Sequence, residues 1–224
     1  MSAAVVRSPG LSGTNAHVLA LLRDIHDVSA ACGTTTFIWG GLTLDILAGR
    51  FLREHHDVDG FTLNLLDVLP EMEARFASLR YATRFLDAWG ILRVERGGTH
   101  AGMNRLERDG ERAMWRHIGD QGTVFFPFAW LDGAPRYFYG VPVYAAGAEL
   151  DYALKANVRL LNPEWVPREQ DAEALQRLEE ELGRRGIAPA DVLARVWSVN
   201  PFWVARGYPE YAEPMMGSAP PPAR

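Results

Sequence analysis

The sequence predicts an α+β chain in which a strand-rich part precedes a C-terminal helical part. Two observations predict this class. Before residue 145, β-branched and aromatic runs alternate with amphipathic helical stretches, whereas after it the apolar residues recur mainly at helical spacing. The chain has 224 residues, of which 48% are hydrophobic, so it is long enough for one domain with a sizeable core and a helical annex.

Charge and cysteine content disfavour several classes of protein. The formal net charge of −5 disfavours a general nucleic-acid binder, which would carry a basic stripe. Cys32 is the only cysteine, so neither a disulfide framework nor a cysteine-based zinc site is expected. No apolar run is long enough to span a bilayer, and residues 1–13 lack the apolar core of a signal peptide. We therefore expect a cytoplasmic protein without a membrane partner.

Helix and strand signals alternate through the first third of the chain. Residues 1–13 are expected to form a loose, flexible tail. A helix capped by Thr14 or Asn15 should run to about Ala31, because apolar residues recur at helical spacing up to Gly33. The elements expected next are a strand over 34–39, a short helix ending at Gly49, a strand over 57–63 and a helix over 69–82 with Pro70 in its first turn.

Strand signals dominate from residue 91 to residue 144. Asp109-Gly110 is typical of a tight hairpin between strands over 103–107 and 111–118. A strand over 137–144 is expected at a sheet edge, because Pro142 has no N–H to donate to a neighbour. The remaining segments are a strand over 91–95, an aromatic-rich segment over 123–131, and helices over 147–161, 168–185 and 189–199.

These elements define the expected organisation of the chain. A strand-containing domain spans 14–145, a C-terminal helical part spans 146–208, and a flexible Pro-rich tail spans 209–224.

The stretch over residues 39–61 carries the most specific pattern. Gly40-Gly41 follows an apolar run and precedes a short helix, where backbone N–H groups can bind a phosphate. Asp57 and Asp59 alternate along the next strand, so both carboxylates point to one face. Alone, the glycines would indicate only a strand-to-helix turn, and the aspartates a solvated strand end. Together they favour a Mg²⁺–phosphate site, because Mg²⁺ binds carboxylates together with substrate phosphates.

This pattern resembles the nucleotidyltransferase superfamily, and most closely its aminoglycoside 2″- and lincosamide-modifying members. Those enzymes carry Gly-Gly, Asp, Gly-Arg, Arg/Lys-x-His and Asp-x-Asp in that order. The matching residues, without a gap, are Gly40-Gly41, Asp45, Gly49-Arg50, Arg53-Glu54-His55 and Asp57-Val58-Asp59. A more diffuse resemblance covers about residues 15–180. It implies the nucleotidyltransferase fold, a mixed sheet flanked by helices.

The resemblance also implies an activity. This is the Mg²⁺-dependent transfer of a nucleoside monophosphate from a nucleoside triphosphate, with ATP favoured, to a hydroxyl of a small molecule such as an antibiotic. Asp57 and Asp59 would hold the metal and act in catalysis. Lys155 would reach the phosphates, with an ion pair as an equal alternative. The full set expected to bind the nucleotide is Gly40, Gly41, Arg50, Arg53 and Lys155.

Two positions depart from the family pattern. The family places a third carboxylate on a strand after a hairpin turn, and the matching residue here is Met114, which can neither bind Mg²⁺ nor accept a proton. Glu111 on the same strand is the candidate catalytic replacement, if a bulge turns it toward the site. Gly60 stands where a large apolar residue usually follows the Asp-x-Asp.

The altered third position keeps three alternatives open. A degenerate nucleotidyltransferase fold would bind a ligand or partner without transferring a nucleotide. A toxin-type nucleotidyltransferase would modify a nucleic acid or a protein, and it would need a basic groove. A repurposed enzyme would use the same pocket for other chemistry in small-molecule biosynthesis.

Overall fold

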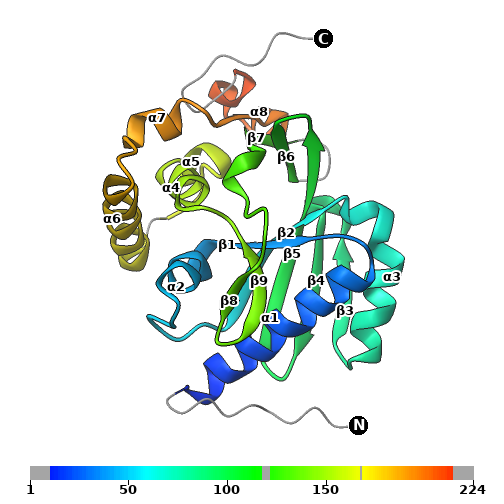
Figure 1. Cartoon of the computed structure of the whole chain (residues 1–224). Coiled ribbons are helices and arrows are strands. Elements are labelled where there is room, and N and C mark those ends of the chain that lie inside the picture. Colours follow the sequence, from blue (N-terminus) through cyan, green and yellow to red (C-terminus); the bar gives the residue numbers. More distant parts are fainter. Residues whose placement is uncertain (1–10, 118–121, 167, 214–224) are drawn as a thin grey trace.

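One ten-stranded mixed sheet forms the centre of the molecule (Figure 1). The computed structural model describes residues 11–117, 122–166 and 168–213. The strand order is β10-β7-β6-β5-β2-β1-β9-β8, and β3 joins through β4, which pairs with β5. The strands are β1 (Thr36–Trp39), β2 (Asp57–Leu63), β3 (Ala82–Leu86), β4 (Ile91–Arg96), β5 (Thr99–Asp109), β6 (Arg112–His117), β7 (Gly122–Pro127), β8 (Arg136–Phe138), β9 (Val141–Ala145) and β10 (Trp197–Val199).

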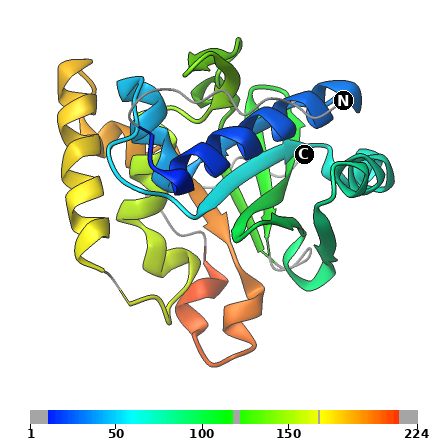
Figure 2. The same ribbon diagram turned by 90° about the horizontal axis from the view of Figure 1, so that it is seen from below.

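Helices flank this sheet on both faces, as Figures 1 and 2 show. The α-helices are α1 (Gly13–Ala31), α2 (Thr43–Ala48), α3 (Leu65–Ser78), α4 (Ala148–Ala156), α5 (Val158–Leu161), α6 (Glu169–Arg184), α7 (Pro189–Leu193) and α8 (Pro201–Val204). Four 3₁₀ turns complete the described elements: η1 (Gly40–Leu42), η2 (Asp87–Trp89), η3 (Phe128–Trp130) and η4 (Pro209–Ala212). No helix within the described ranges is both long and apolar enough to cross a bilayer.

Side chains that alternate along the central strands pack into two separate hydrophobic cores. Ile38 and Val58 point to the face that α1 and α3 cover, whereas Phe37 and Phe61 point to the face covered by α4, α6 and α7. This alternation explains the aromatic and β-branched composition of β1 and β2, because both faces of each strand are buried.

The first helices begin where capping and packing place them. The side chain of Ser12 accepts a hydrogen bond from the backbone N–H of Asn15 at 3.2 Å, so α1 starts slightly earlier than expected. The start expected for the next helix at residue 69 is wrong, because α3 begins at Leu65, directly after Asn64 in the left-handed conformation (φ 52°). Pro70 therefore lies inside this helix, where it removes one backbone donor.

Short strands account for two further corrections. β3 occupies a segment in which no strand was predicted, and it pairs antiparallel with β4. The single strand expected over 137–144 is a hairpin, because Tyr139 and Gly140 both have positive φ and reverse the chain between β8 and β9. β9 is also not an edge strand. It lies between β8 and β1, and it pairs with β1 through Tyr144 and Ala145, beyond Pro142.

The C-terminal part contributes to the sheet as well as to the helices. The helix expected over 189–199 ends at Leu193, and Trp197 and its neighbours form β10, which pairs antiparallel with β7. The ring of Trp197 stacks on Phe125 with 3.8 Å between centroids. The predicted tail does not begin at residue 209, because Tyr211 of η4 is buried against Trp203. Residues 1–10, 118 and 214–224, for which tails or a strand end were expected, lie outside the described residues.

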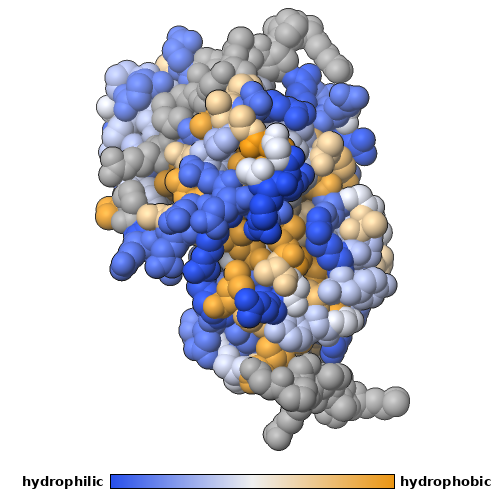
Figure 3. All heavy atoms as spheres, turned by 60° about the vertical axis from the view of Figure 1, so that its left-hand side comes forward, coloured by the Kyte–Doolittle hydropathy of each residue, from blue (hydrophilic) through white to orange (hydrophobic). Residues whose placement is uncertain are grey.

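α6 has the amphipathic pattern of a helix that covers a core. Leu178 and Leu182 are fully buried, while the glutamates at 173 and 180 are exposed. The α6 side of the molecule is largely hydrophilic, with a smaller apolar area between the hydrophilic side chains (Figure 3).

Gly60 is a close-packed position of β2. A Cβ added there would lie 2.8 Å from Cγ2 of Thr36, whose Oγ1 is 2.8 Å from Oγ1 of Thr62. We predict that Gly60→Ala lowers the free energy of unfolding by about 1–3 kcal/mol, because the extra methyl overpacks this site. Thr36→Ser removes Cγ2 but keeps the hydroxyl, so it should recover part of the loss. Urea unfolding of both single variants and the double variant tests this, and simple additivity of the two effects would contradict it.

Candidate functional site

A cavity of about 570 Å³ opens above the sheet face that carries Trp39 and Trp115. Its walls come from both halves of the chain, since η1, α2, β2, β5 and β6 meet α4, α5, α6 and α8 around it. This volume lies within the range typical of small-molecule sites.

Two glycines let the backbone approach the functional side chains closely. Gly40 has φ +79°, and a Cβ there would lie 3.0 Å from Oδ2 of Asp59. A Cβ on Gly41 would lie 2.6 Å from Nη2 of Arg53. The register explains the first approach, because Trp39 at the end of β1 pairs with Asp59 in β2. Position 40 thus needs glycine, because its φ is positive and a Cβ would press on a carboxylate, whereas at Gly41 the clash is with the flexible end of Arg53, which can move aside.

Asp57, Asp59 and Asp151 are three of the six carboxylate residues that line the cavity. Asp57 is exposed and Asp59 is partly buried on one face of β2, as expected from the alternation. The third is Asp151 of α4, whose side chain is almost fully buried. Its Oδ1 accepts a hydrogen bond from the backbone N–H of Gly40 at 2.9 Å, and its Oδ2 is buried without a protein partner. Sequence reasoning missed Asp151, although it precedes Lys155 by four residues and so shares a helix face with it.

Burial raises the proton affinity of two of these carboxylates. Burial, and then the charges of Asp57 and Asp151, raise the pKa of Asp59 to about 7, while Lys155 acts in the opposite direction. Burial raises the pKa of Asp151 to about 6. The hydrogen bond from the Gly40 N–H acts in the opposite direction, because it favours the ionised form. The folded chain therefore holds acidic groups that are costly to ionise together and that a nearby cation would stabilise.

The donor atoms fit a hard divalent cation shared with a substrate. Asp57 and Asp59 offer carboxylate oxygens on one face at the cavity. Among the described residues, no group of three or more His, Cys, Asp or Glu side chains is arranged as a metal site. The side chains thus do not form a complete protein cage. Two carboxylates with open positions match the way Mg²⁺ is bound together with substrate phosphates.

A buried hydrogen-bond network, which we call the clamp and which consists of Asn15, Asp45 and His55, fixes the segment that leads into β2. His55 Nε2 lies 2.8 Å from Oδ2 of Asp45, and the same oxygen accepts a hydrogen bond from the Leu52 N–H at 3.0 Å. Asn15 of α1 binds both the N–H of His55 and the carbonyl oxygen of Arg53, each at 3.0 Å. Asp45 therefore fixes the segment before β2, and the clamp places Arg53 at the cavity.

Four of the five predicted nucleotide-binding residues line this cavity: Gly40, Gly41, Arg53 and Lys155. Lys155 also lies near a second carboxylate, with Nζ 3.9 Å from Oδ1 of Asp171. Arg50 is exposed and is not among the cavity-lining residues, so the structure does not bring it together with the others.

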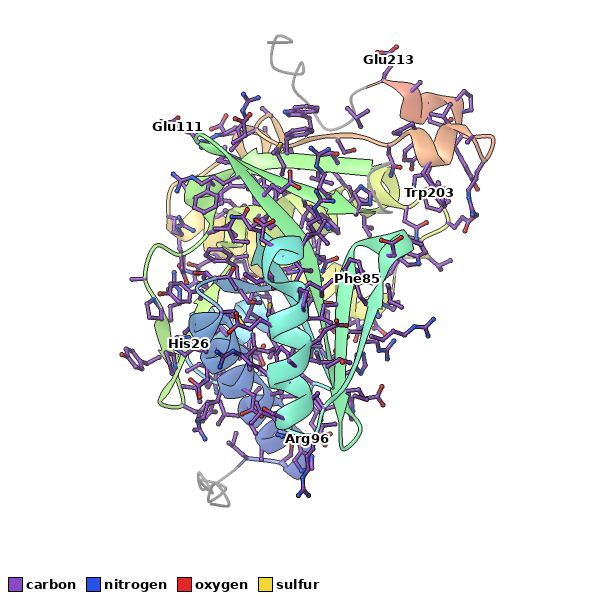
Figure 4. All side chains as sticks on the ribbon, turned by 90° about the vertical axis from the view of Figure 1, so that its right-hand side faces the viewer. His26, Phe85, Arg96, Glu111, Trp203 and Glu213 are labelled. Carbon is purple, nitrogen blue, oxygen red and sulfur yellow. The ribbon has the colours of Figure 1, made fainter. Side chains whose placement is uncertain are left out.

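The structure does not bring Glu111 to the cavity either. Glu111 is exposed in the turn between β5 and β6, and Figure 4 shows it on the opposite side of the view from Trp203, which lines the cavity. Met114 faces away as well, since it alternates with Trp115 and His117, the two β6 residues that line the cavity. Neither residue therefore occupies a third position beside Asp57 and Asp59.

β5, which pairs with β2, carries no carboxylate on the face of the sheet that lines the cavity. β5 runs parallel to β2, with Gly102 opposite Asp59 and Asn104 opposite Phe61. Asn104 lines the cavity, and its Nδ2 donates a hydrogen bond to the carbonyl oxygen of Gly60 at 3.1 Å. The third carboxylate whose charge acts on Asp59 is instead Asp151, which a helix supplies.

Comparisons with known proteins support the fold. No family model matches the chain, and no curated protein sequence does. The chain is similar to the crystal structure of ANT(2″)-Ia in complex with adenylyl-2″-tobramycin, with a TM-score of 0.58 and 18% identity over 76% of this chain and 92% of that one. The solution structure of the antibiotic-resistance factor ANT(2″)-Ia matches with the same TM-score and identity, over 75% of this chain and 86% of that one.

A second type of neighbour has the same fold. The lincomycin-bound lincosamide antibiotic adenylyltransferase LnuA matches with a TM-score of 0.51 and 14% identity, over 68% of this chain and 90% of that one. The predicted nucleotidyltransferase fold, a mixed sheet flanked by helices, is thereby confirmed.

The raised pKa of Asp59 predicts a stability effect. A carboxyl whose pKa rises from its ordinary value near 4 to about 7 binds more protons in the folded state, so its contribution to stability falls as pH rises through that window. Asp59→Asn should therefore stabilise the metal-free protein at pH 8 by roughly 1–3 kcal/mol, and change little near pH 4. Denaturant unfolding in EDTA measures this. The exposed Asp57→Asn serves as control and should have a smaller effect; equal effects at both pH values would contradict the assignment.

Proposed function

We propose that the protein transfers a nucleoside monophosphate from a nucleoside triphosphate to a hydroxyl of a small molecule, with Mg²⁺ bound at Asp57 and Asp59. The observation that carries this proposal is the position of Gly40, which contacts Asp59 on one side and Asp151 on the other. The turn at Gly40 thus lies directly beside a pair of carboxylates suited to a metal ion bound with a phosphate, while the Gly40 N–H itself is held by Asp151.

The residues around this point have complementary roles in binding. Arg53, Lys155 and the backbone of the Gly40-Gly41 turn beyond the Gly40 N–H, which Asp151 already binds, would bind the negatively charged phosphates. When bound, Mg²⁺ would neutralise phosphate charge and help to orient the reacting groups. The clamp of Asn15, Asp45 and His55 would keep Arg53 in position without itself contacting the nucleotide.

The transfer exchanges one bond to phosphorus for another. The acceptor oxygen forms a bond to the α-phosphorus, the bond from that phosphorus to the bridging oxygen breaks, and pyrophosphate leaves. The acceptor hydroxyl loses its proton in this step. We assign Asp151 as the group that accepts it, because its Oδ2 is buried without a partner and its pKa of about 6 is close to neutral pH.

A small acceptor fits better than a polymer. The cavity encloses about 570 Å³, and the chain carries a net charge of −5, whereas a nucleic-acid substrate would call for an extended basic groove. Among the structural neighbours, one binds an adenylylated tobramycin and another binds lincomycin. An antibiotic-like acceptor is consistent with this proposal.

One observation favours a second candidate function. The cavity face of β5 carries Gly102 and Asn104, so this strand adds no carboxylate beside Asp59. A degenerate scaffold that binds a nucleotide or another ligand without transferring a nucleotidyl group would have this arrangement. In that case nucleotide binding would persist, but pyrophosphate release with any acceptor would be absent.

Calorimetric titration with ATP and with GTP, with and without MgCl₂, tests the site. We expect Mg²⁺-dependent binding that Asp57→Ala and Asp59→Ala each weaken at least about tenfold, since each removes a metal ligand. Asp67→Ala, which removes an exposed carboxylate of α3 outside the cavity, is the control and should bind as the wild type does. Wild-type affinity in either site variant would show that the assigned metal site is wrong.

A second experiment separates Asp151 from Glu111. Asp151→Asn keeps an oxygen for the Gly40 N–H but loses the proton-accepting charge, so pyrophosphate release should fall about 10²-fold or more while ATP binding is retained. Glu111→Gln should leave turnover unchanged, because Glu111 is exposed and outside the cavity. The reverse pattern would assign the catalytic carboxylate to Glu111 instead.

A further inference from the structure

The sheet order divides the cavity into two ends. β2, with Asp57 and Asp59, lies between β1 and β5, and β6 follows β5. On the β1 side the chain turns into the glycines of η1, which form the phosphate end. On the β6 side the cavity is lined by a different set, which we call the aromatic end: Trp89, Ile91, Asn104, Trp115, His117 and Trp203.

A continuous surface of rings leads from the carboxylates to the aromatic end. Trp39 stacks on Phe61 with 4.7 Å between centroids and lies 5.3 Å from Trp115. Phe61 contacts Trp115 at 5.3 Å, and Trp115 contacts His117 at 5.0 Å. Because Phe61 follows Asp59 by two residues on the same face of β2, this surface begins next to the carboxylates. Phe61 itself is fully buried beneath it, so the apolar contact area offered to a ring-shaped ligand is that of Trp39 and Trp115, which line the cavity.

Several polar atoms of this surface lack partners. The indole nitrogens of Trp39 and Trp115 are buried and make no hydrogen bond within the protein, and neither does Nε2 of His117. Burial lowers the pKa of His117 to about 4, so its imidazole is neutral at physiological pH. A buried donor without a partner costs free energy, which a ligand oxygen that accepts the indole hydrogen bonds would recover.

The charge at this end argues against a polycationic ligand. None of the described residues that line the aromatic end is acidic, and the cavity carboxylates lie instead on β2, α2, α4 and α6. Several ammonium groups would have no carboxylate to pair with on this surface, although an aromatic face alone can attract a single cation.

We propose that the aromatic end is the acceptor subsite, and that it takes an uncharged, hydroxyl-bearing ring compound, one oxygen of which accepts a hydrogen bond from the indole N–H of Trp115. Its role as an acceptor subsite rests on the proposed nucleotidyl transfer, because that reaction needs a hydroxyl beside Asp57 and Asp59. Trp89 is the most accessible wall of the subsite, with 47% of its surface exposed.

The test uses 7-hydroxycoumarin, a neutral flat compound with one hydroxyl and a carbonyl, and tobramycin as the polycationic probe. Both are titrated calorimetrically into the full chain at a pH where the coumarin hydroxyl is protonated. The variants are Trp89→Ala, which removes an exposed wall, and Trp115→Phe, which keeps a ring but removes the N–H. Tyr137→Ala is the matched control, because Tyr137 is an aromatic residue that is 75% exposed and outside the cavity.

We expect coumarin binding that Trp89→Ala weakens about tenfold or more and Trp115→Phe weakens severalfold, while Tyr137→Ala leaves it unchanged. Tobramycin should bind much more weakly than the coumarin. Thermal unfolding of each variant checks that the fold is retained. If Trp115→Phe fails to fold, the exposed Trp89→Ala still decides the result.

The outcomes separate this proposal from the transfer reaction. Preferential binding of tobramycin, absence of coumarin binding, or coumarin binding that is insensitive to Trp89→Ala would each overturn the subsite, and Mg²⁺-dependent ATP binding would be unaffected. Conversely, if the coumarin binds as expected but ATP does not bind with or without Mg²⁺, the aromatic end stands as a ligand site and the proposed transferase function fails.

Discussion

The hydrogen bond from the Gly40 N–H to Asp151 joins the two halves of this protein at its candidate site. It links a turn after β1 to a helix 111 residues later in the sequence. The Cα of Gly40 faces Asp59 at the same time, so a larger residue would push against a carboxylate oxygen. The burial of Asp151 depends on this contact, because an almost fully buried carboxylate needs hydrogen-bond donors, and the contact ties α4 to the turn after β1.

The negative charges of Asp59 and Asp151 are only partly neutralised within the protein. Lys155 offsets the charges of Asp59 and Asp151, but it also lies 3.9 Å from Asp171, which Arg168 already binds. Burial therefore keeps the pKa values of Asp59 and Asp151 raised in spite of Lys155, at a cost to the stability of the folded chain. Sites that must bind a cation and a polyanion together commonly hold such unfavourable groups, because the same repulsion that destabilises the free chain favours binding.

Local sequence patterns predict the part of the site that is formed by residues close together in the sequence. Gly40, Asp57 and Asp59 follow from a turn and a strand alternation, and the resemblance adds the motif in which they occur. Asp151 could not be found in this way, because only tertiary packing brings it to Gly40. The same limit applies to the fold: long amphipathic helices are recognisable, whereas the three residues of β10 and the turn at Tyr139 carry too little periodicity to reveal a strand or a reversal.

β10 has a further consequence for the integrity of the sheet. By pairing with β7 it occupies backbone donors and acceptors that would otherwise form an open edge, and open edges promote pairing between separate chains. The residues that follow β10 are fastened to α5, since the Trp203 indole N–H donates to the carbonyl oxygen of Leu161 at 2.9 Å. β10 is itself the edge strand on this side, so a strand of three residues replaces the six-residue β7 as the exposed edge and leaves less backbone for pairing between chains. The segment that follows it supplies Trp203 to the cavity wall, so protection from self-association and ligand recognition depend on neighbouring residues of one short stretch of chain.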